Sequence, residues 1–399
     1  MYLSSGSMSD LEKIRKQLHL RNELIAVNAG SWGPLCEAAR RAISKGYLEE
    51  AASRGDDPEL MKTMGGLGRY DSVVKDAKKV LGRFLSCQPE EVALCDSSTT
   101  AMNIFMWGID WKPGDEILTG SLENPAASIP MKILCERHGV KLNVIDQHYG
   151  EHDPTKHFCE AVNPRTRMLL ISDVNFATGG RVDLSTISRA AHDTGALLLA
   201  DGIQAVGTSQ VDVHSLGVDG YAMSRHKFLC GPDGGGALYV RKEAMEHVKP
   251  TYSGVFSSAD HGASEKIALS PTAQRYEVST RPLPVIEGGT AAVNWIMDDV
   301  GLLFILRHTL ELYQDLWDRV SGISGVQVLS GRNQRSLLSF TVNGIEPKTV
   351  VEKLRDELIF TRVIEATLPH CVRISVGFWN RDSDIERIEV TLRRIASHS

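Results

Sequence analysis

The strongest constraint on the fold comes from residues 90–245, where short apolar runs alternate with longer stretches of helical periodicity. The runs at 169–172 and 197–200 are apolar on both faces, which is typical of central strands in a parallel sheet covered by helices. Turn signals such as "WKPGD" at 111–115 and "CGPDGGG" at 230–236 separate the elements. The pattern predicts an α/β fold with a mostly parallel sheet and helices on both faces.

The pattern changes on either side of this region. Helical periodicity at 35–51 and 71–86 precedes it, while long helices at 288–321, 347–358 and 381–396 follow it around the strands "SLLSFTVNG" and "CVRISVGF". A chain of 399 residues is long enough for more than one folding unit. We therefore predict an N-terminal segment over 1–30, a large domain over 31–287 that carries the main site, and a small α+β domain over 288–399.

Charge and cysteine usage limit the functional classes. Charged residues make up 24% of the chain, the net charge is -6, and the two signs are interspersed, so we expect no nucleic-acid partner and no membrane partner. The sequence has neither an apolar window of about 18 residues nor a signal-peptide pattern, which predicts a soluble cytoplasmic protein. The seven cysteines are scattered without a CxxC pair, which favours free thiols and predicts no metal site.

Polar residues stand where several of the apolar runs end. Ligands of open parallel sheets bind beyond the carboxyl ends of the strands, so these positions are candidates for a site. Asp201 follows "LLLA", and Lys227 follows "GYAMSRH". The segment "SSTTA" at 97–101 follows "EVALCD" and opens a helix, and "ENPA" at 123–126 follows "DEILTGSL".

These residue types point to one cofactor. A hydroxyl-rich turn at a helix N-terminus suits a phosphate, although Ser and Thr are also ordinary helix caps. A buried Asp needs a cationic partner such as a protonated ring nitrogen. A buried Lys is costly as an ammonium group but natural as an imine with an aldehyde. A phosphate, a pyridine nitrogen and an aldehyde together predict pyridoxal 5'-phosphate.

The segment "ADGIQAVGTSQVDVHSLGVDGYAMSRHKFLCGPDGGGALYV" resembles the signature of the class V aminotransferase group of fold-type I pyridoxal-phosphate enzymes. That group includes cysteine desulfurases, isopenicillin N epimerase-like proteins and cysteine/cystine C-S lyases. "WGIDWKPGDEIL", "QRYEVSTRPLPVIEGG" and "CVRISVGFWNRDSDIERIEVTLRRI" especially resemble the C-S lyase branch. The resemblance implies the fold-type I architecture and a homodimer with shared active sites.

The resemblance also implies roles for individual residues. Lys227 would form the Schiff base, Asp201 would pair with the pyridine nitrogen, and Gln204 would donate a hydrogen bond to the phenolic oxygen. Asn124 would lie beside the cofactor. The residues implied to hold the phosphate are Thr99, Thr100, Ser224 and His226, with Thr280 reaching the phosphate of the neighbouring subunit. Arg373, and with it Arg362, would bind the substrate carboxylate through the bidentate guanidinium geometry.

Three positions bear on the reaction. Many relatives have a stacking ring where this chain has Asn124, which can neither stack as a ring nor act as an acid or base. Phe176 stands where the lyase branch carries an aromatic residue and desulfurases carry asparagine, so it favours a lyase-like substrate pocket. Cys371, two residues before Arg373 in an apparent strand, is expected in the core rather than as a sulfur acceptor.

We therefore expect an enzyme that cleaves the C-S bond of cysteine, cystine or a cysteine S-conjugate by α,β-elimination, with Lys227 as general base. Transamination, epimerisation and decarboxylation stay open, because the choice among them depends on how the substrate is positioned. A catalytically silent relative that serves as a binding or assembly partner is a further alternative. The intact set of Lys227, Asp201, Gln204 and His226 argues against it.

Overall fold

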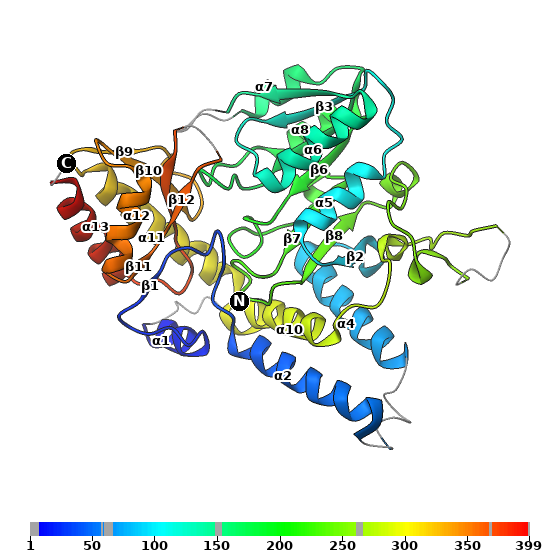
Figure 1. Cartoon of the computed structure of the whole chain (residues 1–399), viewed down its shortest axis with the longest axis horizontal. Coiled ribbons are helices and arrows are strands. Elements are labelled where there is room, and N and C mark those ends of the chain that lie inside the picture. Colours follow the sequence, from blue (N-terminus) through cyan, green and yellow to red (C-terminus); the bar gives the residue numbers. More distant parts are fainter. Residues whose placement is uncertain are drawn as a thin grey trace.

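The structure is a computed structural model that describes residues 8–56, 59, 67–147, 154–260, 266–366 and 369–397. Figure 1 shows a large α/β domain beside a smaller domain built from the C-terminal part of the chain. The N-terminal helix α1 (Met8–Gln17) lies near the smaller domain.

A seven-stranded sheet forms the centre of the large domain, in the order β2-β8-β7-β6-β5-β3-β4. Only β8 runs antiparallel to its neighbours, which confirms the predicted mostly parallel sheet. The strands are β2 (Val92–Cys95), β3 (Glu116–Gly120), β4 (Lys141–Ile145), β5 (Thr166–Ser172), β6 (Leu197–Asp201), β7 (Gly220–Ser224) and β8 (Gly236–Val240).

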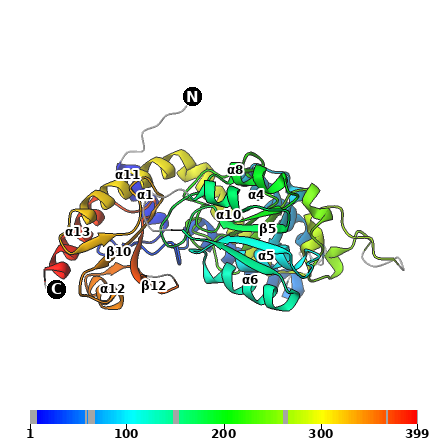
Figure 2. The ribbon, with the colours of Figure 1, turned by 90° about the horizontal axis from the view of Figure 1, so that it is seen from above.

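Helices cover both faces of this sheet, as the two-sided apolar strands predict. On β5, Leu169 and Ile171 pack with one hydrophobic cluster, whereas Met168 and Leu170 pack with another on the opposite face. Figure 2 shows α8 on one side of the sheet and α5 and α6 on the other. The helices of this domain are α2 (Glu37–Ala51), α4 (Leu67–Leu85), α5 (Ser98–Trp107), α6 (Pro125–His138), α7 (Thr155–Ala161), α8 (Leu184–His192), α9 (Val213–Leu216) and α10 (Leu283–Asn294).

The small domain is a four-stranded antiparallel sheet in the order β12-β13-β10-β9, packed against helices. Its strands are β9 (Val326–Val328), β10 (Leu337–Val342), β12 (Arg362–Ile364) and β13 (Cys371–Ser375), and its helices are α11 (Leu302–Ser321), α12 (Pro347–Asp356) and α13 (Asp382–Ala396). A further short strand, β11 (Ile359–Phe360), pairs in parallel with β1 (Ile25–Ala26). The N-terminal segment is therefore tied to the small domain.

The predicted helix over 288–321 is broken in the structure. α10 packs against α2 and α4 of the large domain, whereas α11 packs against α13 and β9 of the small one. Between them lie a π-helical turn, η6 (Trp295–Val300), and Gly301 with a φ of 87°. The remaining short elements are η1 (Ala52–Asp56), η2 (Pro89–Glu91), η3 (Glu243–Glu246), η4 (Val255–Ser257) and η5 (Ala273–Tyr276).

Glycine at 301 permits this backbone conformation without the steric cost that another residue would meet. In the structure the chain changes direction at Gly301, and the predicted domain limits stay a prediction. Within the described ranges, no single helix is long and apolar enough to cross a membrane. The segment from α10 to η6 and the helix α11, bent by 80°, pass that test only as a pair.

Candidate active site

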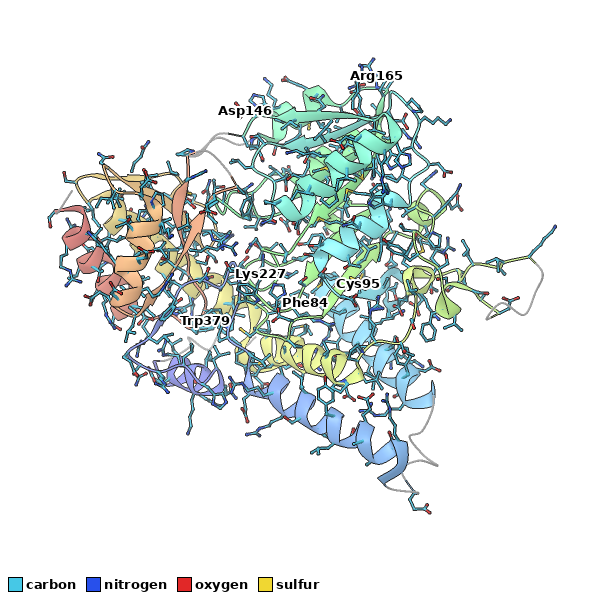
Figure 3. The ribbon with its side chains drawn as sticks, in the orientation of Figure 1. Phe84, Cys95, Asp146, Arg165, Lys227 and Trp379 are labelled. Carbon is cyan, nitrogen blue, oxygen red and sulfur yellow. The ribbon has the colours of Figure 1, made fainter. Side chains whose placement is uncertain are left out.

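A cavity of about 590 Å³ brings together most of the residues predicted for the site. Its walls come from the N-terminal segment, the large-domain strand ends and the small-domain strands β12 and β13. Figure 3 shows Lys227 in the middle of the molecule, where the two domains face each other. The predicted residues that line the cavity are Thr99, Asn124, Phe176, Asp201, Ser224, His226, Lys227, Arg362 and Arg373.

Lys227 lies on the turn after β7 and is only 8% exposed. Burial lowers the pKa of its ammonium group to about 7, because removal from water disfavours the charged form. The positive charges of Arg373 and Arg362 lower this pKa further, while the carboxylate of Asp201 opposes them. The side chain can therefore act as a neutral amine near neutral pH, as a nucleophile or a general base requires.

Asp201 ends strand β6 and is 3% exposed. Its Oδ1 accepts a hydrogen bond from the amide of Ile203 at 3.1 Å. Burial raises the pKa of this carboxyl group, whereas the Ile203 bond and the charge of Lys227 lower it. A carboxylate buried away from water is stabilised by a nearby positive charge. Asp201 is therefore suited to pair with a protonated ring nitrogen.

The N-terminus of α5 forms the polar end of the cavity. Ser97 caps this helix, since its hydroxyl accepts from the amide of Thr100 at 3.1 Å. The Ser98 amide donates to Ser224 Oγ at 2.7 Å, which ties the helix to the end of β7. Thr99 is the next residue of the first turn and lines the cavity. Amide groups and hydroxyls at a helix N-terminus make a suitable phosphate site.

His226, directly before Lys227, also lines the cavity. Burial and the neighbouring Lys227 lower the pKa of its imidazole, and Asp233, whose Oδ1 lies 3.8 Å from Nδ1, raises it. The ring is thereby favoured in its neutral form, which can donate one hydrogen bond and accept another.

Arg373 and Arg362 form the opposite wall of the cavity. They are paired across β13 and β12, directly opposite each other in the antiparallel register. Arg373 is buried, and its Nη1 donates to the carbonyl oxygen of Phe176 at 2.8 Å. Burial, followed by the charge of Arg362, lowers the Arg373 pKa to about 9. In the described part of the chain, neither guanidinium group forms an ion pair with a carboxylate, so the two are suited to an anionic ligand.

Three predicted cofactor residues lie outside the cavity lining, and their roles stay predictions. Gln204 is buried, with Nε2 donating to the Gly30 carbonyl at 3.0 Å, while its Oε1 has no partner among the residues described. The Thr100 hydroxyl is hydrogen-bonded to Ser97 Oγ at 3.1 Å. Thr280 is exposed on the surface of its own chain.

The three positions predicted to bear on the reaction are engaged as follows. Asn124 caps α6, with its side chain accepting from the Ala126 amide at 2.9 Å. Phe176 lines the cavity but is largely buried, packed in a small hydrophobic cluster. Cys371 belongs to that same cluster on β13 and is fully buried, as its apolar setting in the sequence predicts.

Sequence reasoning missed the segment Asn28–Gly33, which supplies Gly30, Ser31 and Trp32 to the cavity. Trp32 is 64% exposed, and its Nε1 donates to Asp233 Oδ1 at 3.3 Å. The only signal for this segment is the turn-like composition of "NAGSWG" after an apolar run. What it contacts lies far away in the sequence.

The model of the family described as "Aminotransferase class-V" matches residues 62–388. The chain belongs to the class-V aminotransferase family. The family is one of pyridoxal-phosphate enzymes, so the cofactor predicted from the strand ends is confirmed. The match spans both domains and includes all the cavity residues that lie after the N-terminal segment.

Several known proteins resemble this chain over nearly its whole length. A probable cysteine desulfurase of Methanothermobacter thermautotrophicus is 25% identical over 402 residues, which is 96% of this chain and 98% of that protein. The cystine C-S lyase C-DES, solved in complex with its reaction product cysteine persulfide, aligns with a TM-score of 0.85 at 24% identity, over 94% and 99% of the two chains. A mutant of C-DES with glycine covalently linked to its PLP cofactor aligns equally well, over 95% and 98%.

Proposed function

We propose that this protein is a pyridoxal-phosphate-dependent lyase that cleaves the C-S bond of cysteine, cystine or a cysteine S-conjugate by α,β-elimination. One observation carries the proposal: a single cavity joins a buried lysine, a buried aspartate and two paired arginines. The similar proteins are named as a probable cysteine desulfurase and a cystine C-S lyase, which supports the C-S bond as the one that is cleaved.

The residues of the cavity fit the cofactor. Asp201 offers a buried carboxylate for the ring nitrogen. Thr99 and Ser224 lie at the N-terminus of α5, where a phosphate is favoured, and His226 lines the same cavity. Gln204 Nε2 donates one of its two hydrogens to the Gly30 carbonyl, so the amide keeps a second hydrogen with which it could donate to the phenolic oxygen. When bound, pyridoxal phosphate supplies an aldehyde that captures the substrate amine and a ring that takes up the electron pair left at Cα.

Lys227 moves the proton in this reaction. Because its pKa is lowered to about 7, a large fraction of the side chain is the neutral amine at neutral pH. In that form Lys227 Nζ removes the Cα proton of the substrate as a general base. Asp201 holds the proton at the ring nitrogen, where a positive charge is compensated by the buried carboxylate.

Arg373 and Arg362 bind the α-carboxylate of the substrate. Their anchor on adjacent strands gives them fixed positions, so the carboxylate they hold orients the bonds at Cα. Loss of the Cα proton and of the sulfur group at Cβ leaves an enamine, which takes up water and releases pyruvate and ammonia. Cystine plus water thus gives pyruvate, ammonia and cysteine persulfide.

Elimination is favoured over sulfur transfer to the protein. A desulfurase that passes sulfur to its own chain needs a cysteine thiol at the substrate, and the described lining of this cavity contains no cysteine. Cys371 is fully buried in a small hydrophobic cluster with Ile364 and Phe176. An aminotransferase remains the second candidate, because the same lysine, aspartate and arginines serve that reaction.

We further propose that the enzyme is a cytoplasmic homodimer. The surface position of Thr280, outside the cavity of its own chain, supports a role at the phosphate of the neighbouring subunit. The seven cysteines form no disulfide within the described part of the chain, in keeping with a reducing compartment. We propose no nucleic-acid or membrane partner for this protein.

A spectral screen of amino acids with product analysis by mass spectrometry tests the proposal. Each substrate should give pyruvate and ammonia, together with cysteine persulfide from cystine, hydrogen sulfide from cysteine and the corresponding thiol from a cysteine S-conjugate. Keto acid together with pyridoxamine phosphate from these substrates would point to an aminotransferase instead.

A further inference from the structure

Ser31 occupies a position that neither the sequence signature nor the predicted site includes. It lies in the segment Asn28–Gly33, which lines the cavity from the N-terminal side, and its side chain is only 6% exposed. A serine so deeply placed at a substrate cavity has few ways to satisfy its hydroxyl group.

Both substrate arginines donate to this one hydroxyl. Arg362 Nη1 lies 3.0 Å from Ser31 Oγ, and Arg373 Nη2 lies 3.1 Å from the same atom. A guanidinium group has donors and no acceptor, so Ser31 Oγ accepts in both hydrogen bonds. Its own proton is therefore left to donate elsewhere. The Arg373 Nε also has no partner among the residues described.

The backbone holds Ser31 in this place before any substrate binds. The Ser31 amide donates to the Asn28 carbonyl at 2.9 Å, and the Gly33 amide donates to the His226 carbonyl at 2.8 Å. At Gly30 a Cβ would lie 2.8 Å from Arg373 Nη2, so a larger residue there would displace the end of the arginine side chain. Ser31 is thus fixed by contacts with both the lysine turn and the arginine wall.

We propose that Ser31 is a specificity-determining residue that donates its hydroxyl proton to the substrate α-carboxylate and fixes the two guanidinium groups around it. The carboxylate then meets three donors from three segments of the chain, two of them charged. An amine that lacks the carboxylate forms no hydrogen bond with these three donors. The inference rests on the amino-acid substrate of the proposed function and does not depend on which Cα or Cβ bond is cleaved.

The test compares binding of two probes to the holoenzyme by calorimetry or absorbance titration. Glycine carries the α-carboxylate, and methylamine lacks it. We expect Ser31→Ala to weaken glycine binding roughly tenfold or more, as for the loss of a hydrogen bond to a charged group, and to leave methylamine binding unchanged. Ser31→Thr keeps a hydroxyl and should restore most of the glycine affinity.

A control variant separates this role from a structural one. Ser209→Ala removes a buried hydroxyl that lies outside the cavity lining and has no partner in the described chain. It should therefore leave the binding of both glycine and methylamine unchanged. Equal weakening of glycine and methylamine by Ser31→Ala, or unchanged glycine binding, would overturn the inference. Should Ser31→Ala fail to fold, the near-isosteric Ser31→Cys, whose thiol is only a weak donor, takes its place. Selective weakening of glycine binding in Ser31→Cys would support the inference, and wild-type glycine binding would overturn it.

The outcome is independent of the reaction. If the protein cleaves no C-S bond but Ser31→Ala loses glycine selectively, the proposed function fails and the carboxylate role of Ser31 stands. If C-S cleavage is observed and glycine binding is unaffected by Ser31→Ala, the proposed function stands and the carboxylate role of Ser31 fails.

Discussion

Gly33 lies so close to Lys227 that a Cβ on Gly33 would be 1.9 Å from the Lys227 carbonyl oxygen. Real Cβ atoms essentially never come this near to another heavy atom, and the backbone cannot yield as a flexible side chain can. The N-terminal segment and the lysine turn are therefore packed backbone to backbone. This contact couples the position of Lys227 to residues almost 200 positions earlier.

Gly33→Ala should displace the lysine turn. We expect at least a tenfold loss of pyridoxal-phosphate affinity, measured by the absorbance of the bound cofactor, since overpacking at such a contact costs about 1–3 kcal/mol or more. Gly322→Ala is a matched control, because a Cβ there would meet only ordinary contacts at 3.5 Å. Wild-type cofactor affinity in Gly33→Ala would show that the two segments do not constrain each other.

The lowered pKa of Lys227 predicts how the apoprotein captures its cofactor. Only the neutral amine attacks an aldehyde, so the capture rate should rise with pH and reach half its maximum near pH 7. Arg373→Leu removes the second-largest cause of the shift, so the midpoint should move to higher pH. Stopped-flow absorbance over pH 5–10 measures both. A wild-type midpoint near the ordinary lysine value of 10.5 would contradict the burial of this amine.

Glu123, directly before Asn124, predicts a pH dependence of stability. Its Oε1 accepts from the Ser172 amide at 2.9 Å, yet burial raises its pKa to about 7 from 4.5. Between these two values the folded chain holds the proton and the unfolded chain releases it, so the free energy of unfolding falls as pH rises. Glu123→Gln has no carboxyl group to titrate at this position. The free energy of unfolding of Glu123→Gln minus that of wild type should therefore rise by about 3 kcal/mol from pH 4 to pH 8.

Denaturant unfolding of the apoprotein at the two pH values checks this prediction. The exposed Glu136→Gln variant is the control, because its side chain is not transferred out of water on folding. If Glu123→Gln differs from wild type by the same amount at both pH values, the Glu123 carboxyl group does not titrate as the structure indicates.

The proposed role of Thr280 predicts complementation between two damaged subunits. Lys227→Ala chains and Thr280→Val chains are each expected to bind or use the cofactor poorly. In a mixed dimer, the site with an intact Lys227 receives an intact Thr280 from its partner, so activity at limiting pyridoxal phosphate should recover on mixing. If Thr280 acted within its own chain, or if the protein were a monomer, mixing would restore nothing.

Local sequence signals were sufficient for the core of the site. Asp201 and Lys227 could be predicted because each follows an apolar run, and the ends of parallel strands meet at one edge of the sheet. The roles proposed for Arg362 and Arg373 came only from resemblance, since charged residues in short strands of an α+β domain are ordinarily surface groups. Their register across β12 and β13 is a property of the folded sheet.

Ser31 and the break at Gly301 could not be predicted in the same way. Ser31 contacts arginines 331 and 342 positions away, and no periodicity in one sequence reveals a pairing at that separation. At Gly301 the apolar pattern continues from α10 into α11, so it resembles one helix, although a residue with a φ of 87° turns the chain. Asn124 also has a local explanation, because asparagine before proline is a common helix start.

Quantifying the products formed from cystine tests most directly whether Lys227 drives elimination at a cysteine-type substrate. We expect pyruvate and ammonia in equal amounts, together with cysteine persulfide. Lys227→Ala should lose at least a thousandfold of all three products while keeping the same thermal stability. Release of alanine in place of pyruvate, or formation of pyridoxamine phosphate without ammonia, would contradict it.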